Sequence, residues 1–195
     1  MRAAGHHCTS VDLPGHGLRR RERYSLAAAA AVIDDAVRAC PEPPLLVGVS
    51  LGGYSSLAYA AEHQRKVSGL VLVACTTEVR TLVVDTYRRL SGGAVRMLRR
   101  PAADWHVVTD MLHALRGHSF LADLRRLHRP VWFVNGVRDP MRLDERRYVR
   151  ALPHATLHVV PRSGHDVHVH APEAFTRLLH GAMAVLRPPR PVVAL

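Results

Sequence analysis

The sequence has few cysteines, few aromatic residues and no long hydrophobic run, and each shortage excludes a class of protein. Its three cysteines, Cys8, Cys40 and Cys75, are an odd number, lie far apart and form no CxxC pair, which argues against a disulfide framework and favours a reducing compartment. The longest run of small apolar residues, 26–33, is far shorter than the roughly 20 residues of a membrane span. The first residues lack the apolar core of a secretion signal. We therefore expect a cytoplasmic protein with no membrane association.

Acidic residues are also scarce. The chain has 16 aspartates and glutamates against 27 lysines and arginines, which gives a formal net charge of +11. The basic residues are nearly all arginine. They are scattered along the chain without the interleaved aromatic residues that would stack on bases. Net charge alone speaks to nonspecific association, so we expect no specific nucleic-acid partner. With 195 residues, 48% of them hydrophobic, the chain can form one domain with a substantial core.

Short apolar runs alternate with longer helical patterns along the chain. This alternation is typical of βα units around a parallel sheet, so the predicted fold class is α/β, a mostly parallel sheet flanked by helices. The expected strands are residues 8–13, 45–49, 67–75, 131–136 and 155–161. The expected helices are residues 25–40, capped by Ser25, 51–64, and 172–186, opened by Pro172.

Two segments depart from the alternation. Residues 76–122 contain no clear strand but do contain helical stretches, and we expect them to form an insertion within the single domain 1–195. Residues 188–195 are rich in proline, and we expect a disordered tail there.

The stretch "VGVSLGG" places Ser50 between a buried strand and a helix, in a GxSxG pattern. Such a strand-turn-helix context forces the serine into a tight, strained turn, for which Gly48 and Gly52 would leave room. The turn exposes the hydroxyl at a helix N-terminus, and the N–H of Leu51 points to where an oxyanion would form. The alternative is a loop serine that merely caps the following helix.

Two partners follow Ser50 in the order that a nucleophilic serine requires. Asp139 follows the strand "VWFVNG", and His165 follows the last strand, in "RSGHD"; parallel sheets place active sites at these strand ends. Asp139 could instead cap a helix that starts near Pro140, and His165 is one of 14 histidines.

A metal site is a further alternative for this region. It would combine His165 with His168 and His170, with His158 nearby. The sequence offers no matching cysteine or glutamate spacing, so we expect no metal and no cofactor.

Taken together, "SVDLPGHGL", "VGVSLGGYSSLAYA", "VSGLVLVAC", "VWFVNGVRDP" and "RSGHDVHVHAPEAF" resemble the α/β-hydrolase superfamily. The resemblance implies that Ser50 is the nucleophile, His165 the base, Asp139 the acid and Leu51 one oxyanion donor. It also implies that residues 76–122 form a short cap over the site. The implied activity is that of a serine hydrolase that acts on a small-molecule carboxylic ester or related acyl substrate through an acyl-enzyme.

The chain departs from the family pattern ahead of "VDLPGHG". Members of the family usually carry opening strands and an HG-type loop there, which supplies a second oxyanion N–H, and we expect both to be absent. An alternative function is therefore a truncated, weakly active or inactive hydrolase that serves as a binding or assembly partner. An unpaired strand edge would also favour a homo-oligomer.

Overall fold

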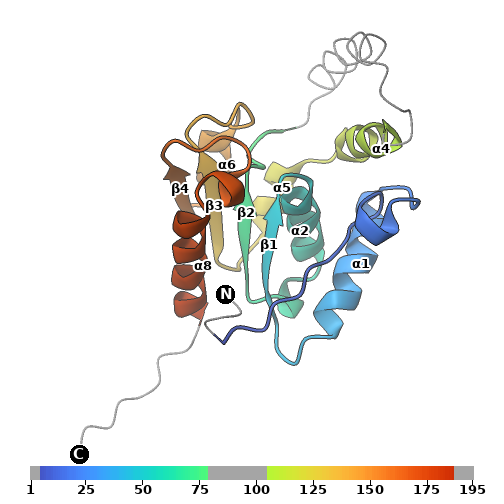
Figure 1. Cartoon of the computed structure of the whole chain (residues 1–195), viewed down its shortest axis with the longest axis horizontal. Coiled ribbons are helices and arrows are strands. Elements are labelled where there is room, and N and C mark those ends of the chain that lie inside the picture. The colour runs from blue at the N-terminus through green and yellow to red at the C-terminus, as the bar shows by residue number, and fades with distance from the viewer. Residues whose placement is uncertain (1–4, 79–104, 187–195) are drawn as a thin grey trace, which may run out of the picture.

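A computed structural model describes residues 5–78 and 105–186, and its centre is a parallel sheet (Figure 1). Four strands lie in the order β1 (Leu45–Val49), β2 (Gly69–Val73), β3 (Val131–Gly136) and β4 (Thr156–Val160). All neighbouring pairs are parallel. Every residue of β2 and β3 is buried, which explains why their sequences are continuous apolar runs.

Helices cover both faces of the sheet, as Figure 1 shows. One hydrophobic cluster joins Leu70, Leu72 and Phe133 to the helices α1 (Leu26–Arg38), α2 (Leu51–Glu62), α5 (Phe120–Arg126) and α6 (Glu145–Ala151). A second cluster joins Val71 and Val73 to the short α7 (Val167–His170) and the long α8 (Pro172–Leu186). Because side chains alternate along a strand, β2 supplies both clusters. The fold is therefore the α/β arrangement that the sequence predicts.

Local signals in the sequence account for the starts of α1 and α8. Ser25 precedes α1, and its hydroxyl accepts a hydrogen bond of 3.0 Å from the N–H of Ala28, as an N-cap does. Pro172 opens α8, as predicted. The described residues also include the short 3-10 helices η2 (Gly17–Arg19) and η3 (Gln64–Lys66). No helix within residues 5–78 and 105–186 is long and apolar enough to cross a membrane.

The predicted strand at residues 8–13 is wrong. These residues form no regular structure, and Val11 is 40% exposed. The carboxylate of Asp12 accepts a hydrogen bond of 2.9 Å from the N–H of Leu18 in η2, so this segment serves the following turn. A strand needs a neighbour to satisfy its backbone groups, and none of the four strands pairs with it.

The outer edge of β1 has no strand partner among the described residues. Val47, in the middle of this strand, is 44% exposed, whereas β2 and β3 are buried throughout. Among the described residues, the outer edge of β1 therefore has no strand to bond its backbone groups, and it carries an exposed apolar side chain.

The predicted cap at residues 76–122 is described only in part, since residues 79–104 lie outside the described ranges. Within the described part, α4 (Trp105–Leu115) contacts the N-terminal segment, where Asp110 binds the Arg23 guanidinium and the N–H of Tyr24. Phe120 and Leu124 of α5 are fully buried in the core. The cap and its boundaries stay a prediction, and the predicted tail at residues 188–195 also lies outside the described residues.

Candidate active site

Ser50 stands on the turn between β1 and α2, in a backbone conformation that side chains rarely adopt. Its φ is 50° and its ψ −114°, a strained geometry for a residue other than glycine. Its N–H donates to the carbonyl of Val73 in β2 at 2.8 Å, which fixes the turn to the sheet. The hydroxyl makes no capping hydrogen bond, so the alternative of a helix-capping serine is wrong.

Two glycines make this turn possible, and only one of them is the expected one. A Cβ on Gly48 would lie 2.3 Å from the carbonyl oxygen of Gly52, and a Cβ on Gly53 would lie 2.5 Å from the sulfur of Cys75. A Cβ on Gly52 would meet no atom within 4 Å outside its own helix and its chain neighbours. The prediction that Gly52 leaves room for close approach is therefore wrong, and Gly53 takes that role.

Leu51, the predicted oxyanion donor, is the first residue of α2. Its N–H belongs to the first turn of a helix, where amides have no acceptor within the helix. This placement fits the predicted role, because the amide and the helix dipole both favour negative charge at this end. Cys75 lies behind the turn, and burial raises the pKa of its thiol, so this cysteine is a neutral packing residue and no rival nucleophile.

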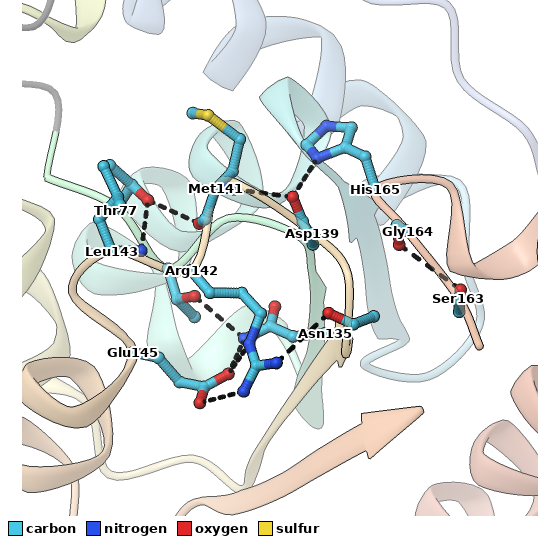
Figure 2. Close-up of polar contacts among 12 residues, drawn as sticks. Thr77, Asn135, Asp139, Met141, Arg142, Leu143, Glu145, Ser163, Gly164 and His165 are labelled. Atoms are coloured by element: carbon cyan, nitrogen blue, oxygen red, sulfur yellow. Dashed lines mark hydrogen bonds and ion pairs between the residues drawn. The ribbon is translucent and has the colours of Figure 1, made fainter. Parts of the chain in front are cut away.

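Asp139 and His165 are brought together, as the sequence predicts (Figure 2). His165 Nδ1 lies 3.1 Å from Asp139 Oδ1. The Asp139 side chain is fully buried, whereas the His165 side chain is 33% exposed. The same Oδ1 accepts the N–H of Met141 at 2.8 Å. Because α6 begins only at Glu145, Asp139 does not cap that helix, and this alternative is wrong.

The parallel sheet places all three predicted side chains at the C-terminal end of its strands. Ser50 follows β1, Asp139 follows β3 and His165 follows β4, and parallel strands end on the same side. Within the described residues, no hydrogen bond joins Ser50 to His165. The structure thus joins Asp139 and His165 by a hydrogen bond and places Ser50 at the same end of the sheet.

The other histidines near His165 have different partners. His170 Nδ1 accepts a hydrogen bond of 3.3 Å from the N–H of Gly164, so it braces the loop that carries His165. The ring of His168 packs against Phe175 at a centroid distance of 6.3 Å. Burial lowers the pKa of His158. Among the described residues, no three His, Cys, Asp or Glu side chains gather as a metal ion requires.

Sequence reasoning missed the side chains that hold the loop of Asp139. Arg142 binds Glu145, Glu145 also binds Asn135, and Thr77 binds the carbonyl of Met141 (Figure 2). The arginine and glutamate stand three residues apart, in "RDPMRLDE". Because Arg142 precedes α6, the spacing rule for ion pairs along a helix does not apply to this pair, and the sequence carried no clear signal for it.

A serine on a strained strand-to-helix turn, a hydrogen-bonded Asp–His pair and a parallel sheet between helices are typical of a protein of α/β-hydrolase type. The comparison with protein families agrees: the alpha/beta hydrolase family matches residues 1–178. The chain therefore belongs to this family.

The curated relatives are esterases. The chain is 43% identical over 75 residues to a pimeloyl-[acyl-carrier protein] methyl ester esterase of Photorhabdus laumondii subsp. laumondii, a region that covers 38% of this chain and 28% of that relative. It is 29% identical over 212 aligned positions to the enzyme of the same name from Chromobacterium violaceum, covering 87% of this chain and 80% of the relative. The chain is thus similar to enzymes of the hydrolase type.

The fold also matches solved structures. A thermophilic esterase superposes with a TM-score of 0.69 at 19% identity, over 90% of this chain and 79% of the other. At this identity, the match shows the shared fold.

Proposed function

We propose that the protein is a serine esterase that hydrolyses a carboxylic ester through an acyl-enzyme on Ser50. The observation that carries the proposal is the combination of the strained Ser50 turn with the hydrogen bond of 3.1 Å between His165 and Asp139. A half-buried serine at a helix N-terminus and an imidazole oriented by a buried carboxylate are the parts that acyl transfer needs.

In the proposed reaction, the Ser50 hydroxyl attacks the ester carbonyl while His165 takes its proton. The N–H of Leu51 donates to the developing oxyanion. His165 then gives the proton to the leaving alkoxide, which departs as an alcohol. His165 then takes a proton from a water molecule, which attacks the acyl-enzyme. As the intermediate collapses to the carboxylic acid, His165 returns this proton to the Ser50 oxygen and both residues regain their starting forms. Asp139 accepts a hydrogen bond from the Nδ1–H of His165 throughout and so fixes the imidazole tautomer.

For the substrate class, we propose an alkyl ester of a small or carrier-borne acyl chain. The support is the similarity to two methyl ester esterases that act on a pimeloyl-[acyl-carrier protein]. Simple methyl and p-nitrophenyl esters of short and medium acyl chains are therefore suitable first substrates.

Covalent labelling tests the nucleophile. A fluorophosphonate probe should label the folded chain, and Ser50→Ala should abolish labelling. Ser56→Ala is the matched control, because Ser56 lies in α2, five residues after the start of the helix, and is 7% exposed. Equal labelling of Ser50→Ala and the parent would refute the assignment. A folded parent chain that neither labels nor hydrolyses any ester would favour the alternative of an inactive binding protein.

Substitution of histidines tests the base. His165→Ala should lower ester hydrolysis by about 10⁴-fold or more, since members of such a triad act as a unit. His168→Ala is the control, because its ring packs on Phe175 and does not touch Asp139. If His168→Ala lost activity and His165→Ala kept it, the base would be misassigned.

A further inference from the structure

The loop that carries Asp139 is held by side chains that do not belong to the proposed triad. This loop runs from the end of β3 to the start of α6, residues 136–145. Arg142 lies inside it and forms a fork with Glu145: Nε donates to Oε2 at 2.8 Å and Nη2 donates to Oε1 at 2.7 Å. Both side chains are largely buried, with 23% and 12% exposure. A planar guanidinium bound in this way has one fixed orientation.

The third nitrogen of the same guanidinium reaches the backbone in front of Asp139. Arg142 Nη1 donates to the carbonyl of Val137 at 3.2 Å, with the carbonyl of Gly136 at 3.5 Å (Figure 2). The Asp139 N–H in turn donates to the Gly136 carbonyl at 3.0 Å. Arg142 therefore binds the carbonyls of two peptide units that precede Asp139, and these peptide units determine the position of the Asp139 Cα.

The fork is itself anchored to the sheet. Asn135, the fifth residue of β3, donates to Glu145 Oε2 at 2.6 Å and to the Thr76 hydroxyl at 3.0 Å. Burial raises the pKa of Glu145, but hydrogen bonds from Arg142 and Asn135 outweigh it, so the pKa lies below its usual value. Glu145 is thus a carboxylate, and the ion pair is fully charged.

Asp139 needs such support because its carboxylate is buried. Its Oδ1 accepts from Met141 and faces His165, while its Oδ2 is buried and has no hydrogen-bond partner among the described residues. A buried anion is costly unless positive charge lies near it. The negative charge of Asp139 contributes to raising the pKa of Arg142, after the larger effect of Glu145, so the two groups attract each other.

We propose that Arg142 is a positioning residue for the esterase reaction: clamped by Glu145 and Asn135, it fixes the turn at residues 136–139 so that Asp139 Oδ1 faces His165 Nδ1. This inference rests on the proposed function. Arg142 acts through Asp139 and touches neither the serine nor the base. A displacement of Asp139 by about 1 Å can cost about 100-fold in rate.

The experiment compares Arg142→Gln with Arg147→Gln. Arg147 is the matched control because it also pairs with a carboxylate three residues away, Asp144, at 2.6 Å, but makes no hydrogen bond to residues 136–139 among the described contacts. For Arg142→Gln we expect kcat to fall about 10- to 100-fold with KM nearly unchanged. Arg147→Gln should keep both constants. Arg142→Lys should recover only part of the loss, since lysine keeps the charge but lacks the fork.

A readout that needs no turnover separates positioning from activity. The His165 Nδ1 proton, hydrogen-bonded to Asp139, should give a far-downfield proton NMR signal that the Ser50→Ala variant keeps. Arg142→Gln should lose or shift this signal upfield, and Arg147→Gln should leave it in place. If the chain hydrolyses no ester but these signals behave as described, the positioning inference stands and the proposed function fails.

The inference is overturned if Arg142→Gln keeps the signal and the parent kcat, or if Arg147→Gln changes both to the same extent. If Arg142→Gln does not fold, Arg142→Lys decides the matter. A folded lysine variant with an unchanged signal and kcat would overturn the inference, and a weakened signal with reduced kcat would support it.

Discussion

Replacement of Gly48 by alanine should destabilise the protein far more than the same change at Gly52. The two glycines occupy equivalent places on either side of Ser50 in the motif, but the structure separates them. At Gly48 a new methyl group would lie 2.3 Å from the carbonyl oxygen and 2.6 Å from the next amide nitrogen of the Gly52–Gly53 peptide. Both are backbone atoms at the start of α2, so relief requires the helix to move away from β1.

The size of the effect follows from these contacts. Extra carbon atoms forced into a tightly packed site cost about 1–3 kcal/mol, and we expect about 2 kcal/mol for Gly48→Ala. Gly52→Ala meets open space and replaces glycine in a helix, which should stabilise by about 0.5 kcal/mol. With a urea dependence of about 2 kcal/mol per molar, the unfolding midpoint should fall by about 1 M for the first variant and rise by about 0.2 M for the second.

Equilibrium urea unfolding followed by circular dichroism measures both variants under one set of conditions. Gly53→Ala provides a third point, because its methyl group would lie 2.5 Å from the Cys75 sulfur and should also lower the midpoint. A Gly48→Ala variant as stable as the parent, or a Gly52→Ala variant less stable than Gly48→Ala, would show that the turn is not packed as described.

Two further predictions concern pH and association. The hydrogen bond to Asp123 raises the pKa of His118 despite partial burial, so protonated His118 stabilises the fold below its ordinary pKa of about 6.5, and this contribution is lost as the pH rises through the raised value. His118→Gln should therefore flatten the decline of unfolding free energy above pH 6.5; an unchanged slope would contradict the assignment. The unpaired edge of β1 with the exposed Val47 should promote self-association, which Val47→Lys should reduce in sedimentation velocity. A parent chain that is monomeric at every concentration would rule this out.

The sequence was most informative where local chemistry and burial agree. The strands LLVGV and VWFVNG are apolar runs beside turn residues, and both lie where the pattern predicts them. Ser25 and Pro172 mark helix starts because capping and proline geometry are local properties. The order of Ser50, Asp139 and His165 could be read for the same reason, since each follows a recognisable strand.

The predictions that failed share a physical cause: the structure at these positions depends on residues that are distant in the sequence. Residues 8–13 have a strand-like pattern, but a strand also needs a neighbour to bond to, and that neighbour cannot be read from six residues. Gly52 fits the motif, yet the close contact at this turn is made by Gly53 against Cys75, a residue that follows the next strand. Arg142 was missed because its guanidinium matters through the carbonyls of residues 136 and 137.

Strained residues follow the C-terminal ends of the strands, and backbone hydrogen bonds just past those ends hold them in place. The non-glycine residues with positive φ among those described are Ser50, Ala74 and Arg162, and each follows the end of a strand. Such residues cost about 1–3 kcal/mol each and persist only when their surroundings fix them. The N–H of Ser50 donates to Val73 and that of Ala74 to Val134.

The same pattern continues across the last two strands. The N–H of Val137 donates to Val160, and that of Arg138 donates to Ser163. Hydrogen bonds between neighbouring chain segments therefore extend past the ends of β1 to β4, and the loops of Asp139 and His165 are continuations of the sheet. Because Asp139 follows Arg138 directly and His165 follows Ser163 by two residues, the hydrogen bond between these loops helps to set the separation of Asp139 and His165. Substitutions that leave this backbone pattern intact should therefore alter the chemistry of the site without displacing it.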